Sequence, residues 1–532
     1  MIGGMQDWPL RIPRLIEHAE REHGTREIVS RWADGSTTRT DWAGVARDAR
    51  RLANALERLG IGRGDRVATL AMNHSRHLAA WYGVIGMGGV IHTINPRLFD
   101  DQLVYIANHA NDRVLFYDAA FAPIVERLKA DWTGIEHYVC FDPAAGEDGF
   151  ERLIAGESDT YAWAEGDERD PAMLCYTSGT TGNPKGVLYE HRSTVLHAMV
   201  GLARDVLNLS TRTVALPIVP MFHAAAWGLP FAAAAAGAKL VFSADYRPEV
   251  LSELFETEQV THSAGVPTVW LSLISHAEAT GASLGQLSLV VIGGSAAPRA
   301  MIEWFMARGV DVGHAWGMTE TSPIGTIGAP QADWDQLGDA QKVDYVAKQG
   351  RAPFGVELRI VDDAGTDLAR DGASSGRLQV RGPWVMSRYF QDESGPAIGP
   401  DGWFDTGDVA LIHPNGVMQI TDRSKDVIKS GGEWISSIEL ENAAVGCPGV
   451  AEAAAVGIAH PKWDERPLLL VVRSDNSDAT PDSILKHLAN HVAKWWLPDE
   501  ILFVDNLPHT ATGKLLKTAL REQYKDHRLP GT

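Results

Sequence analysis

The sequence predicts an α/β protein, with a large N-terminal domain of layered sheets and helices, a β-rich subdomain and a small α+β C-terminal domain. The chain has 532 residues, which is too many for a single hydrophobic core. Apolar strand-like runs alternate with helix-like stretches over much of the chain, as in proteins with buried parallel strands. After about residue 350 the pattern changes to short strand-like runs with turns between them.

The N-terminal alternation opens with a helix and a strand. Residues 45–60 show helical spacing of apolar residues and end on Gly60, a common helix stop. The strand-like run RVATLAMN follows at residues 66–73. Four further strand-like runs continue the pattern, with helical stretches between several of them: VLFYD, YVCFD, KLVFSAD and LVVIGGS. This order predicts largely parallel sheets that are covered by helices.

Two sections follow the alternation. The runs VELRIVDD, GRLQVRG and VMQITDR predict the β-rich subdomain. From Ser424 onward come a hairpin-like KSGGEW, an Ala-rich strand, LLLVVRS, a helix around Ile484–Val492 and ILFVDNLP. We therefore expect one domain over residues 1–423 and a second over residues 424–532, which is a usual domain size.

Charge and hydropathy exclude several function classes. Asp and Glu number 68 against 48 Lys and Arg, which gives a formal net charge of -20. Such an acidic chain lacks the positive surface that nucleic acid requires, and an anionic membrane surface would repel it. The segment AAAWGLPFAAAAAGAKLVF is mostly Ala and is broken by Gly and Pro. We expect it to pack inside the fold, with no integral membrane contact.

The cysteines and the first residues indicate a compartment. Cys140, Cys175 and Cys447 lie far apart and form no CxxC pair, so they predict reduced thiols and not a disulfide framework. Cys175 belongs to an apolar strand-like run, which predicts a core position. Residues 1–20 lack the basic start and apolar centre of a secretory signal. These features predict a cytoplasmic protein.

The segment YTSGTTGNPKGV, residues 176–187, is the main candidate for a functional site. It follows the apolar run AMLCY, which places it at the end of a buried strand. Its glycines let backbone N–H groups approach an anion, its hydroxyls add donors, and Lys185 adds a positive charge. It is not a Walker A loop, because no Ser or Thr follows the lysine. The position after a buried strand favours phosphate binding over an ordinary surface loop.

This segment resembles the core motif of the acyl-adenylate-forming (AMP-binding) superfamily. That superfamily includes acyl-CoA synthetases, coumarate-CoA ligases, peptide-synthetase adenylation domains and beetle luciferases. Other segments resemble the remaining motifs, in the expected order, through most of the chain. The run GGEWISSIELE is most similar to medium- and long-chain fatty acyl-CoA synthetases and to 3-methylmercaptopropionate-CoA ligases. The resemblance implies an ATP-dependent carboxylic acid–CoA ligase that forms acyl-CoA, AMP and diphosphate through an acyl-adenylate.

The resemblance assigns nucleotide contacts to the phosphate loop and to a second loop, VIGGSAAP (291–298), which would lie along the adenine. The residues concerned are Thr177, Ser178, Gly179, Thr180, Thr181, Gly182, Lys185, Gly294, Ser295 and Ala296. The Gly-Gly-Ser of the second loop also resembles half of a hydrolase nucleophile elbow. Ala297 stands where that pattern has Gly, and no triad order stands out, which disfavours the hydrolase.

The segment HAWGMTETSP (314–323) resembles the next motif. The resemblance implies that Trp316 stacks on adenine, that Gly317 lies beside the acid and that Thr319 contacts the α-phosphate. It implies further that Glu320 binds Mg²⁺ together with Thr177. Few carboxylates suit magnesium, because this ion takes substrate phosphate oxygens as ligands.

The segment VPMFHAAAWGLP (219–230) resembles the lining of the acyl pocket. The resemblance places His223 near the reacting carboxylate and makes Trp227 the aromatic gate of fatty acyl-CoA synthetases. Many of those enzymes have Val-Asn where this chain has Ala224 and Ala225. The smaller side chains either leave room for a bulkier acid or are a local difference without effect on the substrate. Without the resemblance, core packing would be the simpler interpretation of Trp227.

Three C-terminal motifs complete the resemblance. It implies that Asp408 accepts hydrogen bonds from the ribose hydroxyls and that Arg423 contacts ribose or phosphate. Lys425 would be the hinge of a mobile C-terminal domain, and Lys514 in LPHTATGKLLK would be the catalytic lysine. The hairpin KSGGEW would close beside the coenzyme A arm through Gly431, Gly432, Glu433 and Trp434.

The resemblance implies ATP, Mg²⁺ and coenzyme A as cofactors or co-substrates, and a homodimer, since related synthetases often dimerise. Fatty acids of medium length are the first expectation, from GGEWISS and Trp227. Short thioether, branched or aryl acids are the alternatives. Three other functions stay open: a luciferase-like oxygenase, an adenylating enzyme serving a carrier protein in trans, and a non-catalytic binder. Lys185, Glu320 and Lys514 argue against the binder.

Overall fold

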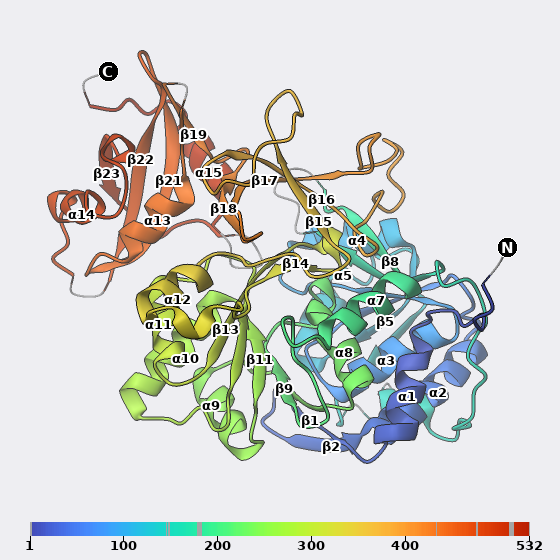
Figure 1. Ribbon diagram of the computed structural model, residues 1–532. Helices are drawn as coiled ribbons and strands as arrows, with labels where there is room; N and C mark the ends of the chain where they lie inside the picture. The colour runs from blue at the N-terminus through green and yellow to red at the C-terminus, as the bar shows by residue number, and fades with distance from the viewer. Residues whose placement is uncertain are drawn as a thin grey trace. The chain divides into compact units, whose positions relative to one another are not determined.

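A computed structural model describes residues 3–144, 146, 149–177, 183–431, 433–474, 477–509 and 515–530. The chain divides into two compact units, shown in Figure 1. The first contains residues 1–357 and 381–404, and the second contains residues 358–380 and 405–532. The predicted boundary between residues 423 and 424 is of another kind, because it marks where a C-terminal domain would begin to move during catalysis. This boundary stays a prediction.

The first unit alternates strands and helices, as the sequence predicts. Its strands are β1 (Glu27–Arg31), β2 (Thr37–Asp41), β3 (Arg66–Leu70), β4 (Val90–Thr93), β5 (Asp112–Tyr117), β6 (His137–Cys140), β7 (Pro171–Tyr176), β8 (Gly186–Glu190), β9 (Val214–Pro217), β10 (Lys239–Ser243), β11 (His262–Gly265), β12 (Leu289–Ile292), β13 (Asp311–Gly317) and β14 (Ile324–Ile327). Its helices are α1 (Pro13–His23), α2 (Trp42–Arg58), α3 (Ser75–Gly86), α4 (Asp100–Ala110), η1 (Ala119–Phe121), α5 (Ala122–Leu128), α6 (Phe150–Ile154), α7 (His191–Gly201), η3 (Ala224–Gly228), α8 (Leu229–Ala236), α9 (Pro248–Thr257), α10 (Pro267–Thr280), α11 (Arg299–Met306), η4 (Thr319–Thr321), η5 (Trp334–Gln336) and α12 (Asp339–Val346).

Two sheets organise this unit. One has eight strands in the order β14-β13-β12-β11-β9-β10-β1-β2, and the other has six in the order β6-β5-β3-β4-β7-β8. All neighbouring strands are parallel except the outer pairs β13–β14, β1–β2 and β7–β8. The predicted largely parallel sheets are confirmed. Ligands of such sheets bind beyond the carboxyl ends of the strands, which is where the phosphate loop leaves β7.

One continuous apolar core joins the strands of both sheets to the helices α1, α2, α3, α7 and α8. Trp81 of α3 stacks on Phe231 of α8, with ring centroids 5.3 Å apart, and both side chains are fully buried. The Ala-rich segment thus packs inside the fold as expected. Within the described residues, none of the helices has the length and apolar character needed to cross a membrane. The cysteines are free and buried.

The second unit contains two further sheets. Its elements are β15 (Glu357–Val361), β16 (Ser375–Arg381), β17 (Phe404–Ile412), β18 (Met418–Arg423), β19 (Ile428–Ser430), β20 (Glu433–Ile435), α13 (Ser437–Val445), β21 (Val450–His460), β22 (Asp464–Arg473), α14 (Pro481–Leu488), η6 (Lys494–Trp496), β23 (Glu500–Phe503) and α15 (Lys517–Gln523). The first sheet has the order β15-β16-β17-β18, and the second has the order β20-β19-β22-β21 with β23 paired to β22. The chain passes from one sheet to the other over residues 424–427.

Side chains of β21 and β22 alternate between two apolar clusters. Ala453 and Leu469 face a cluster that includes α13 and α14, whereas Ala454 and Leu468 face a cluster that includes Leu520 of α15. The helix predicted to reach Val492 already ends at Leu488. The helix ends before the predicted residue because residues 489–491 form a turn that leads the chain into η6.

Candidate functional site

The stem of the phosphate loop is an antiparallel pair formed by the end of β7 and the start of β8. Tyr176 lies opposite Gly186 in the register, and the Thr177 amide donates to the Lys185 carbonyl at 2.9 Å. The stem therefore brings Thr177 and Lys185 together, as a phosphate-binding loop requires. The predicted loop residues between them lie outside the described residues: Ser178, Gly179, Thr180, Thr181 and Gly182.

A tyrosine connects Lys185 with Glu320. The ammonium of Lys185 lies 4.7 Å from the ring centroid of Tyr389, and the Tyr389 hydroxyl donates to Oε1 of Glu320 at 2.8 Å. Burial and the adjacent Glu320 carboxylate raise the pKa of Tyr389, so its phenol keeps the proton that it donates. The Phe390 amide donates to the Gly186 carbonyl at 2.8 Å, which holds this segment on β8.

The backbone of η4 is held on two sides, so that Thr319 and Glu320 have fixed positions. Both residues are 7% exposed. The hydroxyl of Tyr189 on β8 donates to the Thr319 carbonyl at 2.8 Å, and the Met386 amide donates to the Glu320 carbonyl at 2.8 Å. Tyr189 and Tyr389 were not singled out from the sequence. Tyr389 lies outside the recognised motif segments. It reaches Glu320 only because the folded chain brings residues 389 and 390 next to β8, and the sequence does not show this.

The residues present fit a magnesium ion of the kind that nucleotides bring. Across the described parts of the chain, no three or more His, Cys, Asp or Glu side chains gather into a metal-binding cluster. Glu320 contributes one carboxylate, nearly buried, near the stem that carries Thr177. Magnesium commonly uses one or two carboxylates, with phosphate oxygens and waters completing its shell. The assignment of Glu320 and Thr177 to the metal stays a prediction.

The second predicted nucleotide loop leaves the end of β12. Gly294 has a φ of +85°, and Gly294 and Ser295 are exposed, while Ala296 is half-buried. His314 anchors the loop: its Nε2 accepts from the Ala297 amide at 3.3 Å, and its Nδ1 faces the Val346 and Ala347 carbonyls at 3.2 and 3.1 Å. Burial lowers the pKa of His314 to about 4, so the ring is neutral and uses one nitrogen as donor and the other as acceptor. His314 belongs to a recognised motif, but sequence reasoning gave it no role.

Trp316 and Gly317 lie at the end of β13. A Cβ at Gly325 would be 2.3 Å from the ring of Trp316, so only a glycine lets the indole lie against this backbone. A Cβ at Gly317 would be 1.8 Å from the Pro323 carbonyl oxygen. The half-buried indole is thereby fixed in position, as a stacking surface for a base must be.

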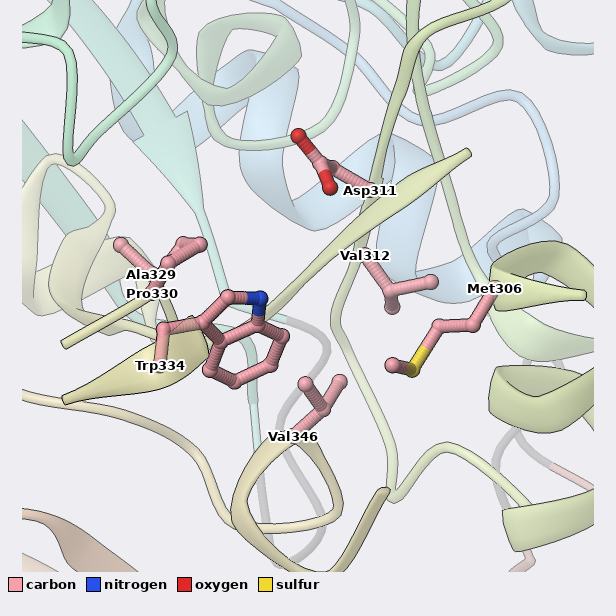
Figure 2. A pocket seen from close by; sticks show the side chains of 7 residues that line it. All are labelled: Met306, Asp311, Val312, Ala329, Pro330, Trp334 and Val346. Carbon is pink, nitrogen blue, oxygen red and sulfur yellow. The ribbon is translucent and has the colours of Figure 1, made fainter. Parts of the chain in front are cut away.

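A small pocket opens at the far end of β13, and Figure 2 shows its lining. Trp334 and Val346 lie on one side of it and Met306 on the other, around a volume of about 20 Å³. None of the predicted site residues lines it. This space holds about one water molecule, so we assign it no substrate.

The predicted acid segment contains an unusual backbone conformation. Residues Ala224, Ala225, Ala226 and Trp227 have φ values of 43°, 53°, 47° and 57°, which form a left-handed turn. This conformation costs roughly 1–2 kcal/mol for each non-glycine residue. Burial of the three alanines, each 4% exposed or less, holds the turn. It directs the Trp227 ring at Gly293, where an added Cβ would lie 3.1 Å from the indole. Such strain is common at functional sites.

Asn73 fixes the chain that leads into this segment. Its side chain is fully buried, and its Nδ2 donates to the carbonyls of Pro217 and Val219, each at 2.9 Å. Its Oδ1 accepts from the Met221 amide at 2.6 Å. All the polar atoms of this amide therefore hold the backbone just before His223, which is half-buried. Asn73 was not identified from the sequence, since a lone Asn carries no motif.

The second unit contains the predicted ribose residues. Asp408 on β17 lies directly opposite Arg423 on β18, and Nε of Arg423 is 2.8 Å from Oδ1 of Asp408. The aspartate side chain is 4% exposed, whereas that of the arginine is 50% exposed. The pair thus presents a fixed carboxylate and a more accessible guanidinium, which suits hydroxyl and phosphate partners respectively.

The predicted hinge and hairpin follow. Lys425 is exposed between β18 and β19, and its carbonyl accepts from Arg521 at 2.7 Å. Strands β19 and β20 form the predicted hairpin, with Lys429 opposite Trp434 and Gly431 at its turn. Three predicted features lie outside the described residues: Gly432, the side chain of Glu433, and Lys514.

A family model described as AMP-binding enzyme matches residues 15–390, and the AMP-binding enzyme C-terminal domain matches residues 439–514. The chain belongs to the AMP-binding enzymes. It is 49% identical to the 3-methylmercaptopropionyl-CoA ligase of Ruegeria lacuscaerulensis, covering 99% of each chain. It is 47% identical to the medium-chain-fatty-acid–CoA ligase of Ectopseudomonas oleovorans, covering 99% of this chain and 98% of that one.

Solved structures agree with this family. An anthranilate CoA ligase, AuaEII in complex with anthranoyl-AMP, matches with a TM-score of 0.86 at 25% identity, over 98% of this chain and 99% of that one. ATP-bound MatB from Rhodopseudomonas palustris matches with a TM-score of 0.84 at 25% identity, over the same shares. The predicted superfamily, the fold class and an acyl-CoA ligase activity through an adenylate are confirmed. The roles of individual residues stay predictions.

In this AMP-binding enzyme, we expect Tyr389→Phe to raise KM for MgATP about tenfold in pyrophosphate exchange. The Phe ring still packs under Lys185, but the hydroxyl bound to Glu320 is lost. A tenfold change matches the lower end of the about 1.5–3 kcal/mol that a hydrogen bond to a charged group contributes. Tyr389→Leu, which also removes the ring, should raise KM further. An unchanged KM for MgATP in Tyr389→Phe would contradict this role.

Asn73→Asp should raise KM for the acid more than KM for ATP. The substitution keeps the shape but removes the two N–H donors that hold Pro217 and Val219. Initial rates at varied acid and at varied ATP measure the two constants, and thermal unfolding measures stability. Asn108→Asp is the matched control, because Asn108 makes similar bonds at an exposed site. If Asn73→Asp lowered the unfolding temperature but left the ratio of the two KM values unchanged, Asn73 would stabilise the fold without positioning the acid segment.

Proposed function

We propose that this acyl-CoA ligase acts on fatty acids of medium length, with MgATP and coenzyme A as co-substrates. The observation that carries the proposal is the contact of Tyr389 with both Lys185 and Glu320. This tyrosine brings the ammonium of Lys185 and the carboxylate of Glu320, which belong to separate motifs, together at the stem of the phosphate loop. The medium-chain relative, matched along nearly its whole length, supports the choice of acid.

The first half-reaction joins two anions, because a carboxylate oxygen attacks the α-phosphorus of ATP and diphosphate leaves. We assign charge neutralisation and alignment to Lys185, Thr319 and Lys514. His223 would hold the acid near the phosphate, and Trp227 would close the acyl pocket. Magnesium, bound by Glu320 and Thr177, would supply further positive charge to the phosphates.

The second half-reaction is thioester formation, in which the sulfur of coenzyme A attacks the acyl carbon and AMP leaves. We propose that the C-terminal domain of residues 424–532, called here the block after Lys425, rotates about this residue. The hairpin that contains Gly431 and Trp434 then guides the thiol of coenzyme A to the acyl carbon. Closure of the site would exclude water, which otherwise hydrolyses the adenylate. The protein thiols are not required as nucleophiles. Cys175 is 1% exposed and its burial raises its pKa to about 11, in line with the predicted core position.

A second candidate substrate is a short thioether acid. The relatives named 3-methylmercaptopropionyl-CoA ligase are 49% identical to this chain over 99% of its length. Branched or aryl acids and service to a carrier protein are less supported. The resemblance also leads us to propose a cytoplasmic homodimer.

An acid panel tests the proposal through AMP release, with and without coenzyme A and oxygen. It compares butyrate, octanoate, palmitate, 3-methylmercaptopropionate and 3-phenylpropionate. We expect the highest kcat/KM with octanoate and thioester only when coenzyme A is present. A maximum with 3-methylmercaptopropionate would select the second candidate. Oxygen-dependent light would indicate an oxygenase, and no AMP release with every acid would contradict the ligase.

A further inference from the structure

A cluster of buried polar side chains lies in the second unit. Lys517 of α15 contacts Oε1 of Glu441 at 2.7 Å and donates to the Ser437 hydroxyl at 2.7 Å. The Ser437 hydroxyl and amide both donate to Oδ2 of Asp422, at 2.7 and 2.5 Å. All four residues are at most 8% exposed. None of them takes part in the chemistry proposed above.

The cluster connects β18 of the first sheet, before the predicted hinge, with helices α13 and α15, which pack on the second sheet after it. Asp422 is on β18, before Lys425, whereas Ser437, Glu441 and Lys517 all follow it. One more contact crosses the same point, because the Ser436 hydroxyl donates to the Thr421 carbonyl. Arg521 donates to the carbonyl of the hinge residue Lys425 itself. A rotation about Lys425 therefore has to separate Asp422 from Ser437.

Charged groups are a costly way to join two sheets. Burial raises the pKa of Asp422, and it raises that of Glu441 to about 7. Apolar side chains of similar size would pack here without this desolvation cost. A polar cluster differs from an apolar contact because its bonds depend on geometry and are lost after a small displacement.

Some bonds of the cluster remain intact when Asp422 and Ser437 separate, so the cluster can form again afterwards. Glu441 follows the hinge, as Lys517 does, and its Oε1 also accepts from the Ala455 amide of β21 at 2.8 Å. If the block turns, Lys517 therefore keeps a carboxylate partner. The links that break are those from Ser437 to Asp422 and from Ser436 to Thr421, and both lie on the edge strand β18, which also carries the predicted ribose residue Arg423.

We propose that Lys517 is a positioning residue that acts through Ser437: it latches the block after Lys425 to Asp422 in one of its two working orientations. The latch closes for one half-reaction and opens for the other. This inference rests on the proposed two-step function. It gives a role to a lysine near the end of the chain, where an exposed side chain would be the ordinary expectation.

Separate assays of the two half-reactions test the latch, with octanoate-dependent pyrophosphate exchange for one and thioester formation from synthetic octanoyl-adenylate for the other. The variants are Lys517→Met and the gentler Ser437→Ala, which removes only the bridging hydroxyl. We expect each to change the ratio of the two rates by about fivefold, as the loss of one hydrogen bond would. Lys525→Gln, which removes an exposed lysine that pairs with Glu522, is the matched control and should leave the ratio unchanged.

Each outcome decides the proposal. A changed ratio in Ser437→Ala, with a normal unfolding temperature, supports the latch. Equal loss of both half-reactions in the variants, or no change in either, overturns the latch. The proposed function is not affected by that result as long as the wild-type protein performs both half-reactions. A wild-type protein that performs neither half-reaction overturns both proposals together.

Discussion

Lys514→Ala is expected to reduce pyrophosphate exchange by about two to three orders of magnitude, the loss seen when one preorganised donor to a reacting oxyanion is removed. The attack of a carboxylate on a phosphate brings negative charges together, so a lysine placed there matters most in that step. Thioester formation from supplied acyl-adenylate should keep much of its rate, because the phosphate chemistry is then already complete.

The control for this substitution is a lysine with no proposed role. Lys486→Ala removes an exposed lysine from α14 and should leave both half-reactions at their normal rates. Equal loss of both half-reactions in Lys514→Ala would show that the lysine has another role. Normal pyrophosphate exchange would assign the catalytic cation to a different residue.

The fold was largely predictable because it depends on burial patterns that are local in the sequence. Apolar runs of strand length marked β3, β5, β6, β10 and β12, and the glycine and hydroxyl content after β7 marked the phosphate loop. The hairpin of β19 and β20 followed from its glycines. The end of α14 was missed because helix ends depend on the turn that follows.

The supporting residues of the site could not be predicted, since they act through contacts between distant segments. Tyr389 matters only because its segment returns to β8, and Asn73 only because its loop meets residues 217–221. The left-handed turn at Ala224–Trp227 is similar: an alanine-rich run has the highest propensity for a right-handed helix. The burial of these alanines stabilises a left-handed backbone here, and no sequence pattern predicts such a turn.

Lys425→Pro is expected to leave one half-reaction near its normal rate and to reduce the other by about two orders of magnitude. Proline fixes φ near −65° and restricts the residue before it, so a turn that must change its backbone angles is held in one state. The Lys425 carbonyl accepts the bond from Arg521, and a proline carbonyl can still accept it. Lys425→Ala, which keeps the backbone free, should retain both half-reactions.

The same variant can separate the hinge from the latch. If proline already fixes the orientation, the link from Ser437 to Asp422 no longer influences how often the block turns. Adding Ser437→Ala to Lys425→Pro should then leave the ratio of half-reactions unchanged, although Ser437→Ala alone shifts it. Such non-additivity is the mark of two residues that act on one equilibrium. Additive effects would mean that Ser437 acts elsewhere, and normal rates for both half-reactions in Lys425→Pro would contradict the hinge itself.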